Sequence, residues 1–267
     1  MKKFSIAVFF FIAACTTSKQ VSQSNSAPPK NIAITGKIFA SLYQQKAAEY
    51  RALCFQAFNI AKLRVDEDMQ TTNSKPRAII TDIDETILDN SAYEVHQTLQ
   101  GKDYESPSWF EWTTMGTADT VPGASSFLQY AASKGITIFY ITNRDEKERA
   151  GTLLNLQKFN LPNADNAHLM LRQGVSSKEI RRQQVATTHH VVLLLGDNLA
   201  DFSSLFDKKP LDERKQNTDD LAETFGKIFI VVPNPVYGDW EYSVYKYSNT
   251  VTTAQKDSAI KSLLKGY

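Results

Sequence analysis

The chain has 267 residues, of which 42% are hydrophobic and 22% are charged, and its formal net charge is +1. A chain of this length buries a substantial core as one domain, or as one domain with a small lobe. Because the net charge is close to zero and the lysines and arginines are scattered, there is no electrostatic basis for binding a nucleic-acid polymer.

The N-terminus has the pattern of a bacterial export signal. A basic start, M-K-K, is followed by an apolar run, Phe4–Ile12, that is too short to span a bilayer. The segment Ile12–Cys15 resembles the lipobox of bacterial lipoproteins, in which the cysteine is lipidated and becomes the mature N-terminus. We therefore expect residues 1–14 to be a signal peptide and Cys15 to carry the lipid that anchors the chain to a membrane.

A flexible tether and a helical segment are expected next. Residues 15–36 form the expected lipidated tether, because Ser, Thr, Gln and Pro are abundant as far as Asn31. By the sorting rule for such lipoproteins, Thr16 after the cysteine favours the outer membrane of a Gram-negative cell envelope. From residue 37 to residue 69 apolar residues recur at helical spacing, which predicts one or two amphipathic helices.

The rest of the chain alternates between strands and helices. Short apolar runs predict strands at 78–80, 136–141, 168–171, 191–195 and 227–232, with helical segments at 124–133, 145–159, 176–185, 208–225 and 252–264. This alternation predicts an α/β fold in which helices flank a parallel sheet. We expect one domain over residues 37–267, with a small, mostly helical lobe formed by 37–72 and 92–121.

Acidic and hydroxyl side chains follow three of the expected strands. Asp82 and Asp84 follow the first strand, Thr142 follows the second, and Asp197 and Asp201 follow the run 191–195. Because parallel strands end at one edge of a sheet, these side chains are expected to lie together. Carboxylate oxygens suit Mg²⁺, and such a pocket suits a phosphate ester, whose oxygens a metal and a lysine neutralise while a carboxylate attacks phosphorus.

Two motifs carry a family resemblance. Residues 82–86, D-I-D-E-T, match the D-x-D-x-T motif of the haloacid dehalogenase superfamily. Residues 82–93, D-I-D-E-T-I-L-D-N-S-A-Y, and 196–202, G-D-N-L-A-D-F, resemble the paired signatures of class C bacterial acid phosphatases. The lipobox and the Y-G-D-W segment at 237–240 resemble the lipoprotein members, and the similarity extends from about residue 42 over the mature chain.

The resemblance implies a fold and a reaction. The fold is a Rossmann-like parallel sheet, and the activity is that of a Mg²⁺-dependent phosphomonoesterase that works through an aspartyl-phosphate. Small phosphate monoesters are the implied substrates, with nucleoside 5′-monophosphates favoured. A phosphotransferase on the same scaffold remains an alternative, as does a surface lipoprotein that binds a flat ligand such as haem.

The resemblance also implies roles for four aspartates. Asp82 matches the nucleophile, and Asp84 matches the general acid and base that protonates the leaving oxygen and then activates water. At the metal site, Asp82, the backbone carbonyl of Asp84 and Asp197 match the ligands, and Asp201 matches the acid that orients metal-bound water.

The expected phosphate-binding residues come from two further motifs. Thr142, with Asn143, matches the motif that binds the transferring phosphate. The third motif is a lysine with little surrounding signature, for which Lys178 is the choice, although Arg181 and Arg182 stay open as alternatives.

The wall that selects the leaving group is expected to be aromatic. Trp109, Trp112, Tyr237 and Trp240 are the candidates, because an aromatic face stacks on a nucleobase or a phenyl ring. Tyr237 is the substrate-binding residue that we favour, since it lies in a loop flanked by proline and glycine after a strand, where binding residues gather.

Overall fold

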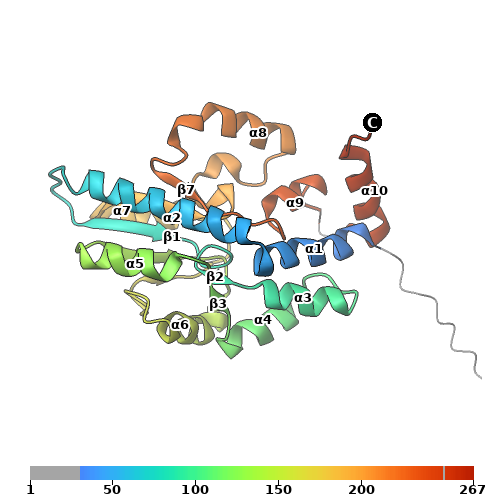
Figure 1. Ribbon diagram of the computed structural model, residues 1–267, viewed down its shortest axis with the longest axis horizontal. Helices are drawn as coiled ribbons and strands as arrows, with labels where there is room; N and C mark the ends of the chain where they lie inside the picture. Colours follow the sequence, from blue (N-terminus) through green and yellow to red (C-terminus); the bar gives the residue numbers. More distant parts are fainter. Residues whose placement is uncertain (1–30, 249) are drawn as a thin grey trace, which may run out of the picture.

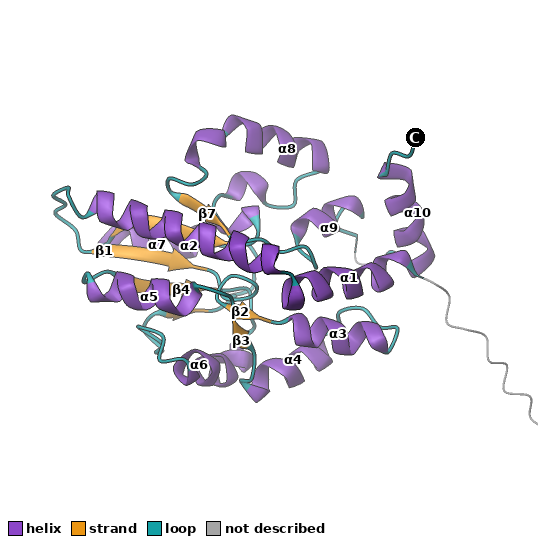
Figure 2. Ribbon diagram, in the orientation of Figure 1, coloured by secondary structure: helices purple, strands orange, loops and turns teal. Residues whose placement is uncertain are grey.

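A five-stranded parallel sheet with helices on both faces forms the centre of the computed structural model, which describes residues 31–248 and 250–267 (Figures 1 and 2). The strand order is β5-β4-β1-β6-β7, which confirms the expected parallel α/β sheet. The strands are β1 (Arg77–Thr81), β4 (Thr137–Ile141), β5 (Leu169–Met170), β6 (His190–Gly196) and β7 (Phe229–Val231). The expected signal peptide and Cys15 lie outside the described residues.

The strands are apolar throughout because both faces of the sheet are buried. Ile79 of β1 pairs with Ile138 of β4, and both point into the larger hydrophobic cluster. Their neighbours Ile80 and Phe139 point to the opposite face and belong to a second cluster. The alternation follows from strand geometry, in which successive side chains lie on opposite faces.

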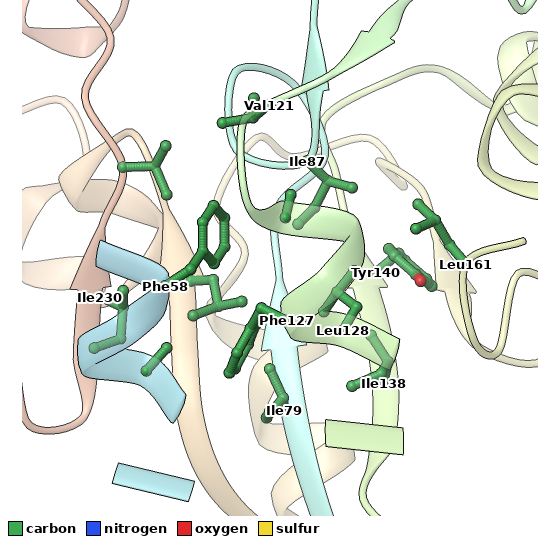
Figure 3. Packing of buried hydrophobic residues seen from close by; sticks show 14 of the residues in the cluster. Phe58, Ile79, Ile87, Val121, Phe127, Leu128, Ile138, Tyr140, Leu161 and Ile230 are labelled. Atoms are coloured by element: carbon green, nitrogen blue, oxygen red, sulfur yellow. The ribbon is translucent and has the colours of Figure 1, made fainter. Parts of the chain in front are cut away.

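Helices α2 (Ala48–Asp68) and α5 (Ala124–Ser133) cover the face of the sheet that carries the larger hydrophobic cluster. Phe58 of α2 and Phe127 of α5 have ring centroids 5.7 Å apart and lie near Ile79 and Ile230 (Figure 3). Burial of one such ring contributes about 1.5–3 kcal/mol. Part of the segment 37–72, which was expected to belong to a small lobe, therefore forms a helix that packs into the main core.

Helix α7 (Glu179–Thr188) contacts the second face through Val185. The same cluster contains the stacked rings of Phe202 and Phe229, whose centroids are 5.0 Å apart. Helices α6 (Arg149–Lys158) and α8 (Leu211–Asp220) complete the segments between strands. The helix expected over 176–185 begins only at Glu179, with no side-chain cap, so Lys178 stands immediately before the helix.

A smaller helical layer lies beyond the carboxyl edge of the sheet. It contains α1 (Ile32–Lys46), α3 (Ser91–Leu99), α4 (Ser106–Met115), α9 (Asp239–Val244) and α10 (Thr253–Leu263), and α1 and α3 lie side by side (Figure 1). A two-stranded antiparallel sheet, β2 (Leu88–Asp89) and β3 (Asp119–Thr120), lies at the base of this layer. Among the helices of the described residues, none combines the length and apolarity that crossing a bilayer requires.

Helix α1 corrects the expected end of the tether. The tether was expected to reach residue 36, but α1 begins at Ile32. The side chain of Asn31 accepts a hydrogen bond from the backbone N–H of Ile34 at 3.0 Å, which is a standard N-cap. The helix then buries Ala33, Lys37, Ser41 and Gln44, whose spacing places them on one face. Three of these four side chains are polar, so the hydrophobic pattern gave little sign of this face.

Candidate active site

A cavity lies at the carboxyl edge of the sheet, at the point where the order of the strands changes direction. Strand β1 is flanked by β4 on one side and β6 on the other, so Asp82 after β1 lies between Thr142 and Asp197. The backbone N–H of Asp82 donates to the carbonyl of Leu195 at 2.9 Å, which continues the strand pairing to this residue. Ligands in open α/β sheets bind at this kind of crevice. A cavity of about 360 Å³ opens there, and Asp82, Asp84, Asn143, Lys178, Asp197, Asp201 and Tyr237 are among its lining residues.

Three carboxylates meet in this cavity. Asp82, Asp197 and Asp201 each offer an oxygen, and these oxygens lie within 4.8 Å of one another. The pKa of Asp82 is raised to about 7, chiefly by burial and also by the charges of Asp201 and Asp84, while Lys178 acts in the opposite direction. Burial and the charges of Asp201 and Asp82 also raise the pKa of Asp197. The cluster therefore has unbalanced negative charge and hard oxygen donors, a combination that fits a divalent cation.

Lys178 joins two of these acids. Its ammonium nitrogen is 2.5 Å from Oδ1 of Asp82 and 2.6 Å from Oδ1 of Asp201. Burial disfavours the charged form, but the two carboxylates more than offset this effect and raise the pKa of Lys178 above its ordinary value. Lys178 thus presents a permanent positive charge beside the proposed nucleophile.

The two arginines that the sequence left open contact other groups. Arg181 donates to the carbonyl of Thr142 at 2.6 Å and to Oδ1 of Asn143 at 2.8 Å. Arg182 donates to the carbonyl oxygens of Ala200 and Asp201, at 2.9 and 2.8 Å. Arg181 therefore supports the Thr142–Asn143 loop, and of the three candidates Lys178 is the one that lines the cavity.

Close backbone packing positions Asp201. A Cβ atom added at Gly196 would lie 2.5 Å from the Cβ of Asp201, which real contacts do not allow. Oδ2 of Asp201 also accepts a hydrogen bond from the backbone N–H of Asn198 at 3.0 Å. The glycine of the G-D-N segment is therefore needed so that Asp201 can fold back over the end of β6.

Asp84 has a cationic partner that the sequence did not reveal. Nη2 of Arg144 lies 2.7 Å from Oδ1 of Asp84, and Nε lies 3.1 Å from the same oxygen. Asn90 donates to this oxygen as well, at 2.9 Å. Arg144 directly follows Thr142 and Asn143 at the end of a strand, and this position is the sequence feature that could have indicated a role in the site.

A buried carboxylate anchors Tyr237. The hydroxyl of Tyr237 donates to Oε2 of Glu85, while the backbone N–H of Asn90 donates to Oε1 at 2.7 Å. Burial and the charge of Asp84 raise the pKa of Glu85, against the effect of these hydrogen bonds. Glu85 therefore fixes the turn after β1 and also fixes the ring of Tyr237 against the cavity.

The four aromatic candidates separate into two groups. Trp109 and Tyr237 line the cavity. Trp112 instead donates from Nε1 to Oδ1 of Asn90 at 2.8 Å, and Trp240 lines a different groove, between α1, α9 and α10.

A further contact in the site involves Asn234, which the sequence did not indicate as a site residue. Its side chain donates a hydrogen bond to Oδ2 of Asp197 at 2.8 Å.

This arrangement supports phosphoryl chemistry. One buried carboxylate and a lysine share the cavity with a second carboxylate, Asp84, and with two further acids that suit a cation. Phosphoryl transfer to a carboxylate requires these groups: the nucleophile, a cationic side chain, a second carboxylate that can transfer protons, and a metal site.

Comparison with known proteins agrees with the geometry. A family model described as "HAD superfamily, subfamily IIIB (Acid phosphatase)" matches residues 11–240. Two solved structures of the class C acid phosphatase from Bacillus anthracis, one of them with tungstate bound, are each 37% identical to this chain and have a TM-score of 0.85. They match 88% of this chain and 98% and 99% of their own chains. The expected family and enzyme class are confirmed: the chain belongs to subfamily IIIB of the HAD superfamily and is an acid phosphatase that hydrolyses phosphate monoesters.

Proposed function

We propose that this phosphatase uses Mg²⁺, forms an aspartyl-phosphate on Asp82 and favours nucleoside 5′-monophosphates. The observation that carries the proposal is the contact of Asp82 with Lys178 inside a cluster that also contains Asp197 and Asp201. Burying a lone ionised carboxylate costs free energy, which Lys178 and a bound metal ion would offset for Asp82. A buried carboxylate with such partners in a cavity is typical of a functional site, here that of a nucleophile.

The residues divide the reaction between them. A carboxylate oxygen of Asp82 attacks phosphorus, and the bond from phosphorus to the leaving oxygen breaks. Asp84 gives its proton to the leaving oxygen and then takes a proton from the water that hydrolyses the acyl phosphate. Lys178, Thr142 and Asn143 bind the phosphoryl oxygens and hold them in line with Asp82.

The donor set suits Mg²⁺ in particular. Asp82, Asp197, Asp201 and the backbone carbonyl of Asp84 would hold the ion, because small hard cations prefer oxygen ligands. When bound, the ion would neutralise charge on the phosphoryl oxygens. The tungstate in one Bacillus anthracis structure is a tetrahedral oxyanion like phosphate, and it supports an oxyanion site in this fold.

The walls of the cavity support a nucleotide substrate. Tyr104, Trp109 and Tyr237 line it, and aromatic faces stack on nucleobases with little dependence on base identity. Its volume of about 360 Å³ is in the range of small-molecule sites.

The proposed location is the outer membrane, through lipid on Cys15. Residues 16–31 would separate this cysteine from the first helical residue, Ile32, and would keep the cavity away from the bilayer. Mass spectrometry of the mature N-terminus tests the anchor: a diacylglyceryl cysteine supports it, and an unmodified N-terminus at another residue contradicts it.

The central test is hydrolysis of an aryl phosphate. We expect turnover to disappear in EDTA, to return with added Mg²⁺ and to be absent in Asp82→Asn, which keeps the shape of the side chain but lacks the nucleophilic charge. Asp119→Asn, at an exposed position outside the cavity, is the matched control and should keep full activity. Metal-independent turnover, or full activity in Asp82→Asn, contradicts the mechanism. Release of less phosphate than phenol when glycerol is present would instead indicate phosphotransfer.

A further inference from the structure

Helix α1 has polar residues on its buried side and apolar residues on its exposed side. Three of the four residues that it buries are polar: Lys37, Ser41 and Gln44. Its large exposed apolar residues are Ile32, Phe39, Leu42 and Tyr43, and 76% of Phe39 is exposed. A surface helix of a globular protein normally has the opposite arrangement. The exposed side of α1 is therefore a candidate for contact with a partner.

The polar inner side of α1 has partners within the protein, which fix the orientation of the helix. Lys37 belongs to a buried charge network that also contains Lys256 and three acids, Glu94, Asp103 and Glu241. Gln44 donates a hydrogen bond to Oδ1 of Asp89 at 2.8 Å. Rotation of the helix would break these contacts, so its apolar side stays on the surface.

An apolar groove continues this surface towards the C-terminus. The groove lies between α1, α9 and α10 and has a volume of about 340 Å³. Helix α10 lies beside the start of α1, where Asp257 accepts a hydrogen bond from the backbone N–H of Ala33 at 3.2 Å (Figure 1). We call the exposed apolar residues of α1 and of this groove the docking face: Ile32, Phe39, Leu42, Tyr43, Trp240, Leu263 and Leu264.

The docking face is separate from the catalytic cavity. Among the described residues, Lys37 is the one that lines both the groove and the cavity, and it is buried. A partner on the docking face would therefore not compete with substrate for the catalytic side chains.

The charges at the border of the docking face favour an anionic partner. Lys46 ends α1, and Lys261 and Lys265 lie in the last turn of α10 and just after it. All three are exposed and form no ion pair with any other described residue. Helix α1 contains no acid, and α10 contains one, Asp257. Lysines in such positions attract anionic lipid headgroups.

The aromatic residues of the docking face favour a lipid bilayer in particular. Tyr43 and Trp240 combine an apolar ring with a polar group, and residues of this kind gather at the interface between membrane and water. Interfacial helices carry Trp, Phe and Leu on the side that enters the bilayer and Lys at its border. The docking face and its three lysines have this composition.

The proposed lipid anchor would place the docking face near a bilayer. Residues 16–31 connect Cys15 to Ile32, which is the first residue of the docking face. A chain of this length spans at most about 55 Å when fully extended, so the face would stay close to the membrane. At such distances even a weak contact is occupied, because the effective concentration is high. The anchor gives a second copy of the chain no such advantage.

We propose that the docking face binds the surface of an anionic lipid bilayer. The apolar side chains of α1 and α10 lie at the level of the headgroups, and Lys46, Lys261 and Lys265 contact the lipid phosphates. This inference rests on the proposed anchor at Cys15 and adds a second, non-covalent contact with the same membrane. The two contacts together hold the folded domain in one orientation on the bilayer.

Tryptophan fluorescence tests the docking. The full chain, as cells process it, is reconstituted into vesicles of phosphatidylcholine and phosphatidylglycerol, with or without bromine on the acyl chains, because bromine quenches only nearby tryptophans. The chain has three tryptophans, of which Trp240 belongs to the docking face. We expect brominated vesicles to lower the total emission by up to about one third, the share of one tryptophan in three. Trp240→Phe should abolish this quenching.

Charge variants at exposed positions identify the face. Phe39→Glu and Leu264→Glu should each reduce the quenching about threefold or more, because a carboxylate is disfavoured among lipid chains and near anionic headgroups. Ile180→Glu makes the same change of charge at an exposed position on α7, outside the docking face, and should keep the quenching of the wild type. Hydrolysis of a soluble aryl phosphate should be unchanged in all three variants, since none of these residues lines the catalytic cavity.

Several results would overturn the inference. The wild type may show no quenching, or Phe39→Glu and Ile180→Glu may retain it equally. Equal quenching in vesicles of phosphatidylcholine alone would overturn the role of the lysines. A chain that is dimeric in detergent as wild type but monomeric as Phe39→Glu, with no quenching in vesicles, would assign the face to a second copy. Absence of lipid on Cys15 by mass spectrometry would overturn the proposed anchor, whereas quenching by added vesicles decides the docking face separately.

Discussion

Arg144 holds the carboxylate of Asp84 from one side, with Nη2 2.7 Å and Nε 3.1 Å from the same oxygen, Oδ1. The guanidinium is itself fixed, because its Nη1 donates to Thr152 at 3.0 Å and only 1% of its side chain is exposed. The proposed proton donor therefore depends on a rigid cation for its orientation.

Arg144→Lys should lower kcat about tenfold, because a lysine keeps the charge but cannot reproduce two contacts from one planar group. If Arg144 acts through Asp84, the loss of kcat should be smaller for p-nitrophenyl phosphate than for glycerol phosphate. The p-nitrophenolate can leave without a proton, whereas the alkoxide of glycerol must be protonated as it leaves. Steady-state kinetics on both substrates check this prediction. An equal loss on the two substrates would mean that Arg144 does not act through proton transfer.

Gly196→Ala should disrupt the acid cluster. The new methyl would lie 2.5 Å from the Cβ of Asp201, so Asp201 and its contact with Lys178 must shift. We expect a loss of about 1–3 kcal/mol in the free energy of unfolding and a higher Mg²⁺ concentration for half-maximal activity. Gly36→Ala is the control, because nothing lies within 4 Å of its added Cβ and helix α1 should gain about 0.5–1 kcal/mol. Unchanged metal activation in Gly196→Ala would argue against this packing constraint.

Tyr237 should show separate effects of its ring and its hydroxyl. Tyr237→Ala should raise KM for AMP about tenfold, through loss of stacking, and should raise KM for a small alkyl phosphate less. Tyr237→Phe keeps the ring but removes a donor from buried Glu85, so it should lower stability by about 1–3 kcal/mol with a small change in KM. Equal KM effects of Tyr237→Ala on both substrates would remove the stacking role.

Asp68 should make stability depend on acid pH. It ends α2 and accepts hydrogen bonds from Nε of Arg77 at 2.7 Å and Nε2 of His190 at 2.8 Å, at the amino ends of β1 and β6. Burial acts against the charged form, but these hydrogen bonds lower the pKa of Asp68 below its ordinary value. The stabilisation is therefore complete above the unfolded pKa of about 4 and is lost as pH falls through the lower folded value.

Asp68→Asn should accordingly lose about 1–3 kcal/mol of unfolding free energy at neutral pH, and the difference from wild type should shrink below about pH 4. Urea unfolding at several pH values measures it. Asp219→Asn, at an exposed position in α8 with no side-chain hydrogen bond in the described residues, should show little change at any pH. A difference between wild type and Asp68→Asn that is constant from neutral to acid pH contradicts this role.

The sheet and its carboxyl edge were predictable because they depend on local patterns. The strands are short apolar runs, and parallel pairing then brings Asp82, Thr142 and Asp197 to one edge regardless of their separation in sequence. Lys178 was the choice among three cations, and in the structure its ammonium contacts Asp82, although α7 begins at Glu179, three residues later than predicted.

The remaining parts of the site depend on contacts between distant segments. The contact of Arg144 with Asp84 can be inferred only once β1 and β4 are known to pair. The hydrogen bond of Tyr237 to Glu85 joins residues that are 152 positions apart in the sequence. Lys37 was least accessible to prediction, since a lysine in an amphipathic helix is normally solvated. Its burial requires acids from α3, from the loop at Asp103 and from α9, and no spacing within α1 indicates them.

The position of Lys37 has a consequence for shortening or diversifying the enzyme. A fragment that starts at α2 would keep all five strands and every side chain assigned to phosphoryl transfer, yet it would leave Glu94, Asp103 and Glu241 with Lys256 as their one cation from the network. Helix α1 is thus needed to balance this buried negative charge, although it contributes no strand and no residue assigned to phosphoryl transfer. Lys37 also lines the active-site cavity, so variants in α1 reach the substrate side of the enzyme while both signature motifs stay untouched.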